Sequence, residues 1–156
     1  MKKGLLIFVL GIFLSGFAEA QVQGDARIQG FGYYGLKSRQ FGFGGGLEYF
    51  FVDNFAIAPS FTKLNPEVGN QSNFSMDLRY YLTEGVSQVY VLAGYSQTFQ
   101  NTQPGTPGTK ENFKGANMGV GAFIKLTEWV GLSTEFRFQS QFRQEGGFRF
   151  GLAFPL

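Results

Sequence analysis

The feature that most constrains this chain is a period of two in its apolar residues after about residue 20. The clearest segment sets Phe74, Met76, Leu78, Tyr80 and Leu82 against Ser75, Asp77, Arg79 and Tyr81. Apolar residues two apart share one face of a β-strand, whereas a helix would space them three or four apart. Glycine, at 23 of 156 residues, also recurs too often for long helices. The pattern therefore predicts an all-β chain.

The alternation repeats in eight segments of about ten residues, the length of a tilted strand that crosses a membrane. The expected strands cover residues 26–36, 41–49, 55–62, 74–82, 88–99, 117–126, 130–139 and 147–154. The first and fifth segments alternate less regularly, so their faces stay unassigned. Short turns at 52–54, 83–85 and 127–129 alternate with connections near 37–39, 64–72, 101–114 and 143–146. Short turns at one end and longer loops at the other are typical of outer-membrane barrels.

The composition of the two faces indicates which of them meets solvent. A soluble lipocalin-like barrel, apolar inside, would also alternate. A soluble surface is rich in Lys and Glu, however, and here only 15% of residues are charged and the polar face is mainly Gly, Ala, Ser, Asn and Thr. The Phe-rich face would be a large apolar patch in water, whereas lipid satisfies it. We therefore expect lipid contact, with an aromatic girdle at the short-turn end formed by Phe50, Phe51, Tyr80, Tyr81 and Trp129.

The first 20 residues are typical of a cleaved secretory signal peptide. Lys2 and Lys3 precede an uncharged apolar run from Gly4 to Phe17, and Ala18-Glu19-Ala20 then offers a cleavage site. The run is shorter than the roughly 20 residues that a membrane-spanning helix needs. We expect residues 1–20 to be removed and residues 21–156 to form one barrel domain.

With these features, the chain resembles the small OmpA/OmpX-type outer-membrane proteins. The resemblance implies an eight-stranded antiparallel up-and-down transmembrane β-barrel in a bacterial outer membrane. The last residues also resemble the C-terminal signal that the outer-membrane assembly machinery reads, with Arg149, Gly151, Phe154 and Leu156 in its positions. Leu156 departs from the pattern, because the family usually ends in an aromatic residue.

Charged residues on the predicted inward face suggest a network inside the barrel. The residues of this set alternate along their strands with the residues expected to face lipid. They are Glu48, Asp77, Arg79, Lys125, Glu135, Arg137 and Arg149, and Arg27 can join them. Buried charges must pair or become neutral. A structural plug is the simplest interpretation, because side chains fill an eight-stranded barrel. A gate that opens when the pairs exchange partners is the alternative.

Several classes of function do not fit the composition. The chain has no His and no Cys, so we expect no metal site, no cofactor and no catalytic residues, and hence no enzyme. The net charge of +2 gives no case for nucleic acid. The connections, in contrast, carry an excess of basic residues, which either form a solvated loop surface or contact lipopolysaccharide phosphates. These loop charges are Lys37, Arg39, Lys63, Lys110, Lys114 and Arg143 against Glu67, Glu111 and Glu145.

The sequence therefore predicts a non-catalytic outer-membrane barrel that supports envelope integrity, surface contact or adhesion. Its expected partners are outer-membrane lipid, the outer-membrane assembly machinery and lipopolysaccharide. A weak gated channel for ions or small solutes is the main alternative. A soluble periplasmic ligand-binding barrel is the second.

Overall fold

The computed structural model describes residues 23–66, 69–102, 110–141 and 144–156. The signal peptide expected over residues 1–20 lies outside these residues, and so do the loop residues Glu67 and Arg143. The described residues form strands and connections, and no helix among them is long and apolar enough to cross a membrane. The eight strands are β1 (Ala26–Gly35), β2 (Phe41–Val52), β3 (Phe55–Asn65), β4 (Asn70–Tyr81), β5 (Ser87–Asn101), β6 (Lys110–Lys125), β7 (Gly131–Gln139) and β8 (Glu145–Pro155).

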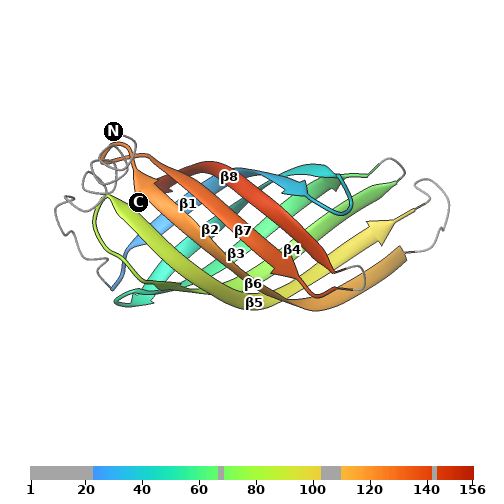
Figure 1. Ribbon diagram of the computed structural model, residues 1–156, viewed down its shortest axis with the longest axis horizontal. Coiled ribbons are helices and arrows are strands. Elements are labelled where there is room, and N and C mark those ends of the chain that lie inside the picture. Colours follow the sequence, from blue (N-terminus) through green and yellow to red (C-terminus); the bar gives the residue numbers. More distant parts are fainter. Residues whose placement is uncertain (1–22, 67–68, 103–109, 142–143) are drawn as a thin grey trace, which may run out of the picture.

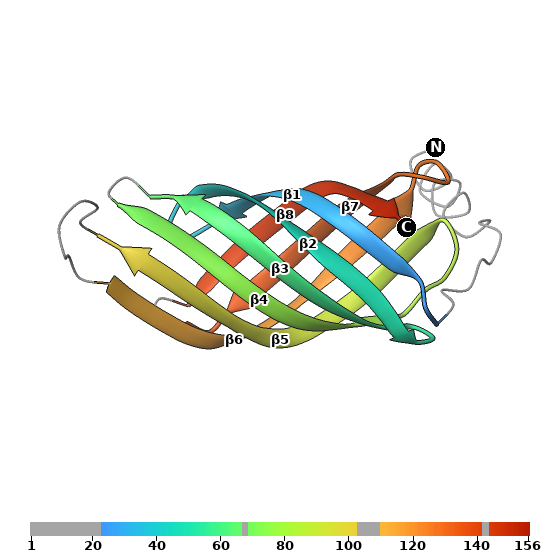
Figure 2. The ribbon, with the colours of Figure 1, turned by 180° about the vertical axis from the view of Figure 1, so that it is seen from behind.

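Consecutive strands pair antiparallel, and β8 pairs with β1, so the sheet closes into a barrel (Figure 1). β1 begins and β8 ends at the end of the barrel that carries the turns 53–54, 82–86 and 126–130, and the longest connection, 102–109 between β5 and β6, lies at the other end (Figures 1 and 2). This is the eight-stranded antiparallel up-and-down barrel that the alternation predicts. In the turn after β2, Asn54 has a positive φ of 65°, which Asn tolerates better than most residues.

Two connections are shorter than the sequence predicts, because strands replace parts of them. β3 continues to Asn65, β4 begins at Asn70, and β6 begins at Lys110. The backbone ladder continues there through polar pairs such as Gln100 with Glu111. Residues that are polar on both faces of a strand show no hydrophobic period, so the sequence pattern does not mark these strand ends.

Most apolar side chains point outward, and most charged and other polar side chains of the strands point into the barrel. Phe43, Phe61 and Phe150 are 56%, 52% and 53% exposed, whereas Ser75, Asp77 and Arg137 are buried. This arrangement excludes the soluble ligand-binding barrel, whose apolar face would line the interior. The faces that the sequence left open are now assigned, with Phe31 and Tyr33 of β1 and Tyr90 and Leu92 of β5 pointing inward.

The facing of the strands predicts how a charge on the outer surface affects stability. Val120, in the middle of β6, and Val52, at the turn end of β2, are both half exposed. Val120→Arg should lower the free energy of unfolding in lipid vesicles by about 2–4 kcal/mol, because the charge enters the hydrocarbon. Val52→Arg, near the interface, should cost at most about 1 kcal/mol. Equal losses in the two variants, measured by denaturant titration, would contradict the placement of β6 in the membrane.

Candidate functional site: a buried ion-pair network in the barrel

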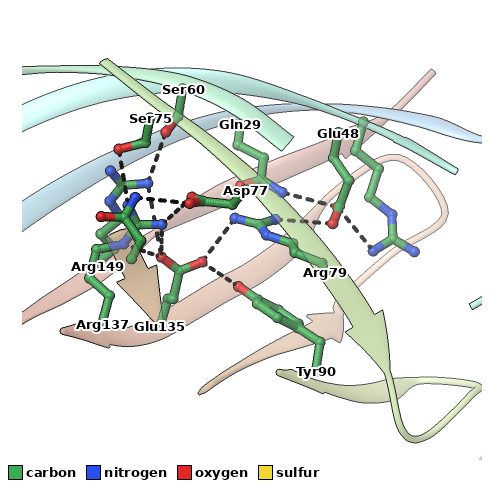
Figure 3. A network of polar contacts seen from close by, with 12 residues as sticks. Gln29, Glu48, Ser60, Ser75, Asp77, Arg79, Tyr90, Glu135, Arg137 and Arg149 are labelled. Atoms are coloured by element: carbon green, nitrogen blue, oxygen red, sulfur yellow. Dashed lines mark hydrogen bonds and ion pairs between the residues drawn. The ribbon is translucent and has the colours of Figure 1, made fainter. Parts of the chain in front are cut away.

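Charged side chains from five strands meet inside the barrel (Figure 3). Six of the seven residues that the sequence placed in the lumen belong to this set, and all six are buried. The network residues are Arg27 on β1, Glu48 on β2, Asp77 and Arg79 on β4, Glu135 and Arg137 on β7, and Arg149 on β8.

Arg79 links the two sides of the lumen. Its Nη1 lies 3.0 Å from Oε1 of Glu48, and its Nη2 lies 2.9 Å from Oε2 of Glu135. The guanidinium carbon also lies 4.7 Å from the centre of the Tyr90 ring, a cation–π distance. One planar cation thus connects β4 with both β2 and β7.

Arg137 forms ion pairs with two carboxylates of the network, Asp77 and Glu135. Its Nη2 lies 2.6 Å from both Asp77 Oδ2 and Glu135 Oε1, and its Nε donates to the same Glu135 oxygen at 2.7 Å. A further hydrogen bond reaches Ser75 Oγ at 3.3 Å. Arg137 is fully buried, so these partners replace the water that a guanidinium normally binds.

Neutral side chains complete the coordination of the carboxylates. Tyr81 Oη donates to Glu48 at 2.6 Å, and Tyr90 Oη donates to Glu135 at 3.0 Å. The amide of Asn117 donates to Asp77 at 2.9 Å, and the amide of Gln29 donates to Glu48 at 3.1 Å. Sequence reasoning missed these partners, although Asn117 lies on a predicted inward face.

The structure corrects two members of the predicted aromatic girdle. Phe50 and Tyr81 are 0% and 1% exposed and point into the barrel, where their ring centroids lie 5.1 Å apart. Phe50 follows the outward-facing Tyr49, so the alternation of the strand turns Phe50 inward although it lies close to the turn. The register shifts only after Phe50, between Phe50 and Val52. Phe51, Tyr80 and Trp129 are exposed, and their role in a girdle stays a prediction.

Arg27 and Arg149 have weaker contacts with carboxylates than the central pair of arginines. Arg27 lies 3.6 Å from Glu48, and Arg149 lies 3.9 Å from Glu135. Arg149 instead donates to the hydroxyls of Ser60 at 3.0 Å and Thr62 at 3.3 Å. In this network four arginines face three carboxylates, so its formal charge is +1.

Aromatic rings lie against the same two arginines. The guanidinium carbon of Arg27 lies 4.1 Å from the centre of the Phe123 ring, and that of Arg149 lies 4.4 Å from the centre of the Phe31 ring. Ring faces attract cations and so compensate part of the missing anionic contact.

The remaining predicted residues lie nearer the turn end. Lys125 is half-buried at the end of β6 and, with Asp25 and Glu128, lines a depression at the turn end. Gly151 faces the lumen, Phe154 is half-buried and Leu156 is 80% exposed at the end of the chain. The use of these C-terminal residues as an assembly signal stays a prediction.

The network separates cavities at the two ends of the barrel. The loop-end cavity has a volume of about 220 Å³ and is lined by residues such as Tyr33, Thr98 and Gln139. The turn-end cavity has a volume of about 160 Å³ and is lined in part by Arg27 and Phe123. The two linings share no residue, and the buried ion pairs lie between them.

Comparison with known proteins agrees with this architecture. No protein-family model and no curated protein matches the sequence significantly. The N-terminal β-barrel domain of Pseudomonas aeruginosa OprF is similar, with 23% identity and a TM-score of 0.76 over 87% of this chain and 100% of that one. Pseudomonas aeruginosa OprG shares 11% identity at a TM-score of 0.67, covering 90% of this chain and 99% of that one.

A third similar structure is Ail, the attachment invasion locus protein of Yersinia pestis, in complex with the heparin analogue sucrose octasulfate. It shares 15% identity at a TM-score of 0.63, over 86% of this chain and 100% of that one. At these identities the likeness concerns the fold. Together with the outward apolar face, it defines the chain as a small eight-stranded transmembrane β-barrel with the fold of these outer-membrane proteins.

The contacts of Arg137 lead to a stability prediction. Arg137→Met should lower the free energy of unfolding by about 3–5 kcal/mol, because it leaves the Asp77 carboxylate buried without its cation. The double variant Asp77→Asn/Arg137→Met should recover part of that loss, since the stranded charge is removed as well. Denaturant unfolding in lipid vesicles measures both. A single variant as stable as the wild type, or a double variant no more stable than the single, would contradict the pairing.

Proposed function

We propose that this protein is a non-catalytic barrel with a closed lumen that supports envelope integrity and surface contact. The observation that carries the proposal is the fully buried set of ion pairs across the middle of the barrel. Arg79 and Arg137 hold carboxylates from three strands, so the axis is occupied by side chains that would be costly to separate. The chemistry accessible to partners then lies on the outside of the barrel and at its loop end.

The distribution of charge supports contact with lipopolysaccharide. Among the described residues, the loop end carries Lys37, Arg39, Lys63, Lys110 and Lys114 against Glu111 and Glu145, whereas the turn end carries Asp25, Asp53, Glu84 and Glu128 against Lys125. In outer-membrane barrels the longer loops lie outside the cell. The basic end therefore faces the phosphate-rich outer leaflet. The complex of Ail with a sulfated heparin analogue is consistent with polyanion binding by this class of barrel.

Two further parts of the proposal rest on the sequence. Arg149, Gly151, Phe154 and Leu156 serve as the signal that the assembly machinery reads. Residues 1–20 are the cleaved signal peptide that directs the chain across the inner membrane.

A gated channel is the second candidate, and one observation favours it. Glu135 contacts three arginines, at 2.9 Å, 2.6 Å and 3.9 Å, so it has alternative partners to which it can move. A channel of this kind would give stepwise conductance in planar bilayers that changes in Glu135→Gln. The closed barrel that we propose would give none.

A deletion strain separates the two functions. If the protein supports the envelope, its loss should increase the entry of a hydrophobic fluorescent dye such as N-phenyl-1-naphthylamine, and expression of the wild-type chain should reverse this. If the protein is a channel, dye entry should not change and the uptake of small polar solutes should slow. Unchanged dye entry in the deletion strain would contradict the proposed role.

A further inference from the structure

Three lysines share the outward face of the barrel at its loop end. Lys63 lies on β3, and Lys110 and Lys114 lie on β6. All three are exposed, and none has a side-chain ion pair or hydrogen bond within the described part of the chain. The buried arginines, in contrast, all have partners. These lysines are therefore available to an anion from outside the protein.

The strand register places the lysines around one patch. Lys63 pairs with Ser72, Ser72 with Phe99, and Phe99 with Asn112. Three strand spacings, about 14 Å in all, thus separate Lys63 from Asn112. Lys110 and Lys114 flank Asn112 on the same face of β6, two residues before it and two after it.

A groove of about 540 Å³ lies in this patch, and its lining joins three kinds of group. Lys63 and Lys110 supply two positive charges, and Glu111 is the one acidic residue in the lining, so the lining has a net positive charge. Ser72 and the amides of Asn70, Asn101 and Asn112 supply neutral hydrogen-bonding groups. Phe61 and Phe99 supply apolar surface.

The apolar part continues toward the membrane. Phe61 pairs with Phe74, Phe74 with Gln97, and Gln97 with Lys114. Phe61, Phe74 and Phe99 are exposed on the outward face. The patch thus places cations and amides beside aromatic rings that face lipid. A ligand that fits it must carry phosphate and sugar groups at one end and acyl chains at the other.

We propose that the groove lined by Lys63, Lys110 and the neighbouring Asn and Phe residues, with Lys114 beside it on the same face of β6, binds the phosphorylated, acylated sugar headgroup of lipopolysaccharide. The lysines hold the phosphates, the Asn and Ser side chains bind sugar hydroxyls, and the Phe rings contact the first part of the acyl chains. This site gives the lipopolysaccharide contact of the proposed function a defined place on β3 to β6, and so it rests on that function.

Binding to purified lipid A tests the site directly. The probes are bisphosphorylated lipid A and the same lipid with both phosphates removed, titrated onto the full barrel in detergent and followed by native mass spectrometry. The wild type should prefer the phosphorylated probe. Lys63→Gln/Lys110→Gln should weaken that binding by about 25-fold, at about fivefold for each basic residue, and leave the dephosphorylated probe unaffected.

Two control variants make the result specific. Lys37→Gln/Arg39→Gln removes the same charge from the connection after β1 and should weaken binding less than about threefold, because neither residue lines the groove. Lys63→Arg/Lys110→Arg keeps the charge and should bind like the wild type. Heat-modifiable migration on gels verifies that each variant is folded.

The outcomes separate the site from the function on which it rests. Equal weakening by the two Gln double variants, or none by Lys63→Gln/Lys110→Gln, would overturn the groove but leave lipopolysaccharide contact by the basic loop end in place. A wild-type barrel that binds both probes equally would overturn the groove and also the proposed contact with lipopolysaccharide phosphates.

Discussion

Closure of the backbone ladder between β1 and β8 is the constraint on which the rest of the structure depends. The pairing runs from Arg27 with Pro155 to Gly35 with Gly147, so the first and last strands leave no open edge along this length. A lipid core offers no hydrogen-bond partner to a backbone N–H or C=O, and only a closed sheet satisfies all of these groups with strands. Closure also creates an axis that lipid does not reach, and the inward side chains must fill it.

The residues that fill the lumen alternate along each strand with the apolar residues that face lipid. Phe136 faces lipid and its neighbour Arg137 faces the axis, so adjacent residues meet opposite environments. The interior takes polar side chains, and the cost of burying them is offset by mutual pairing, as when Glu135 accepts from both Arg79 and Arg137. Because these contacts tie several strands together, they support the proposal that the charged interior is structural and that recognition takes place at the loop end and on the outward face.

The fold and most inward charges were predictable from the sequence, because strands such as β4 and β7 alternate cleanly and every second residue then faces the same side of the sheet. It failed where inward positions are themselves apolar, as with Tyr90 and Leu92 on β5, since such residues erase the difference between the faces. Phe50 was assigned to the girdle from its closeness to a turn, although its parity points inward. The partner of each charge was not predictable either, because the meeting of Glu135 with Arg79 depends on strand stagger around the closed barrel.

The facing of the strands is tested most directly by single nitroxide labels along β7 in the reconstituted barrel. Labels at Leu132, Thr134 and Phe136 should show high accessibility to oxygen, which concentrates in the hydrocarbon, and a label at Ser133 should show low accessibility. Ser133 lies on the same face as the ion pairs, and none of the labelled residues belongs to them. A profile of opposite parity, or one without a period of two, would mean that the charged residues do not fill the axis.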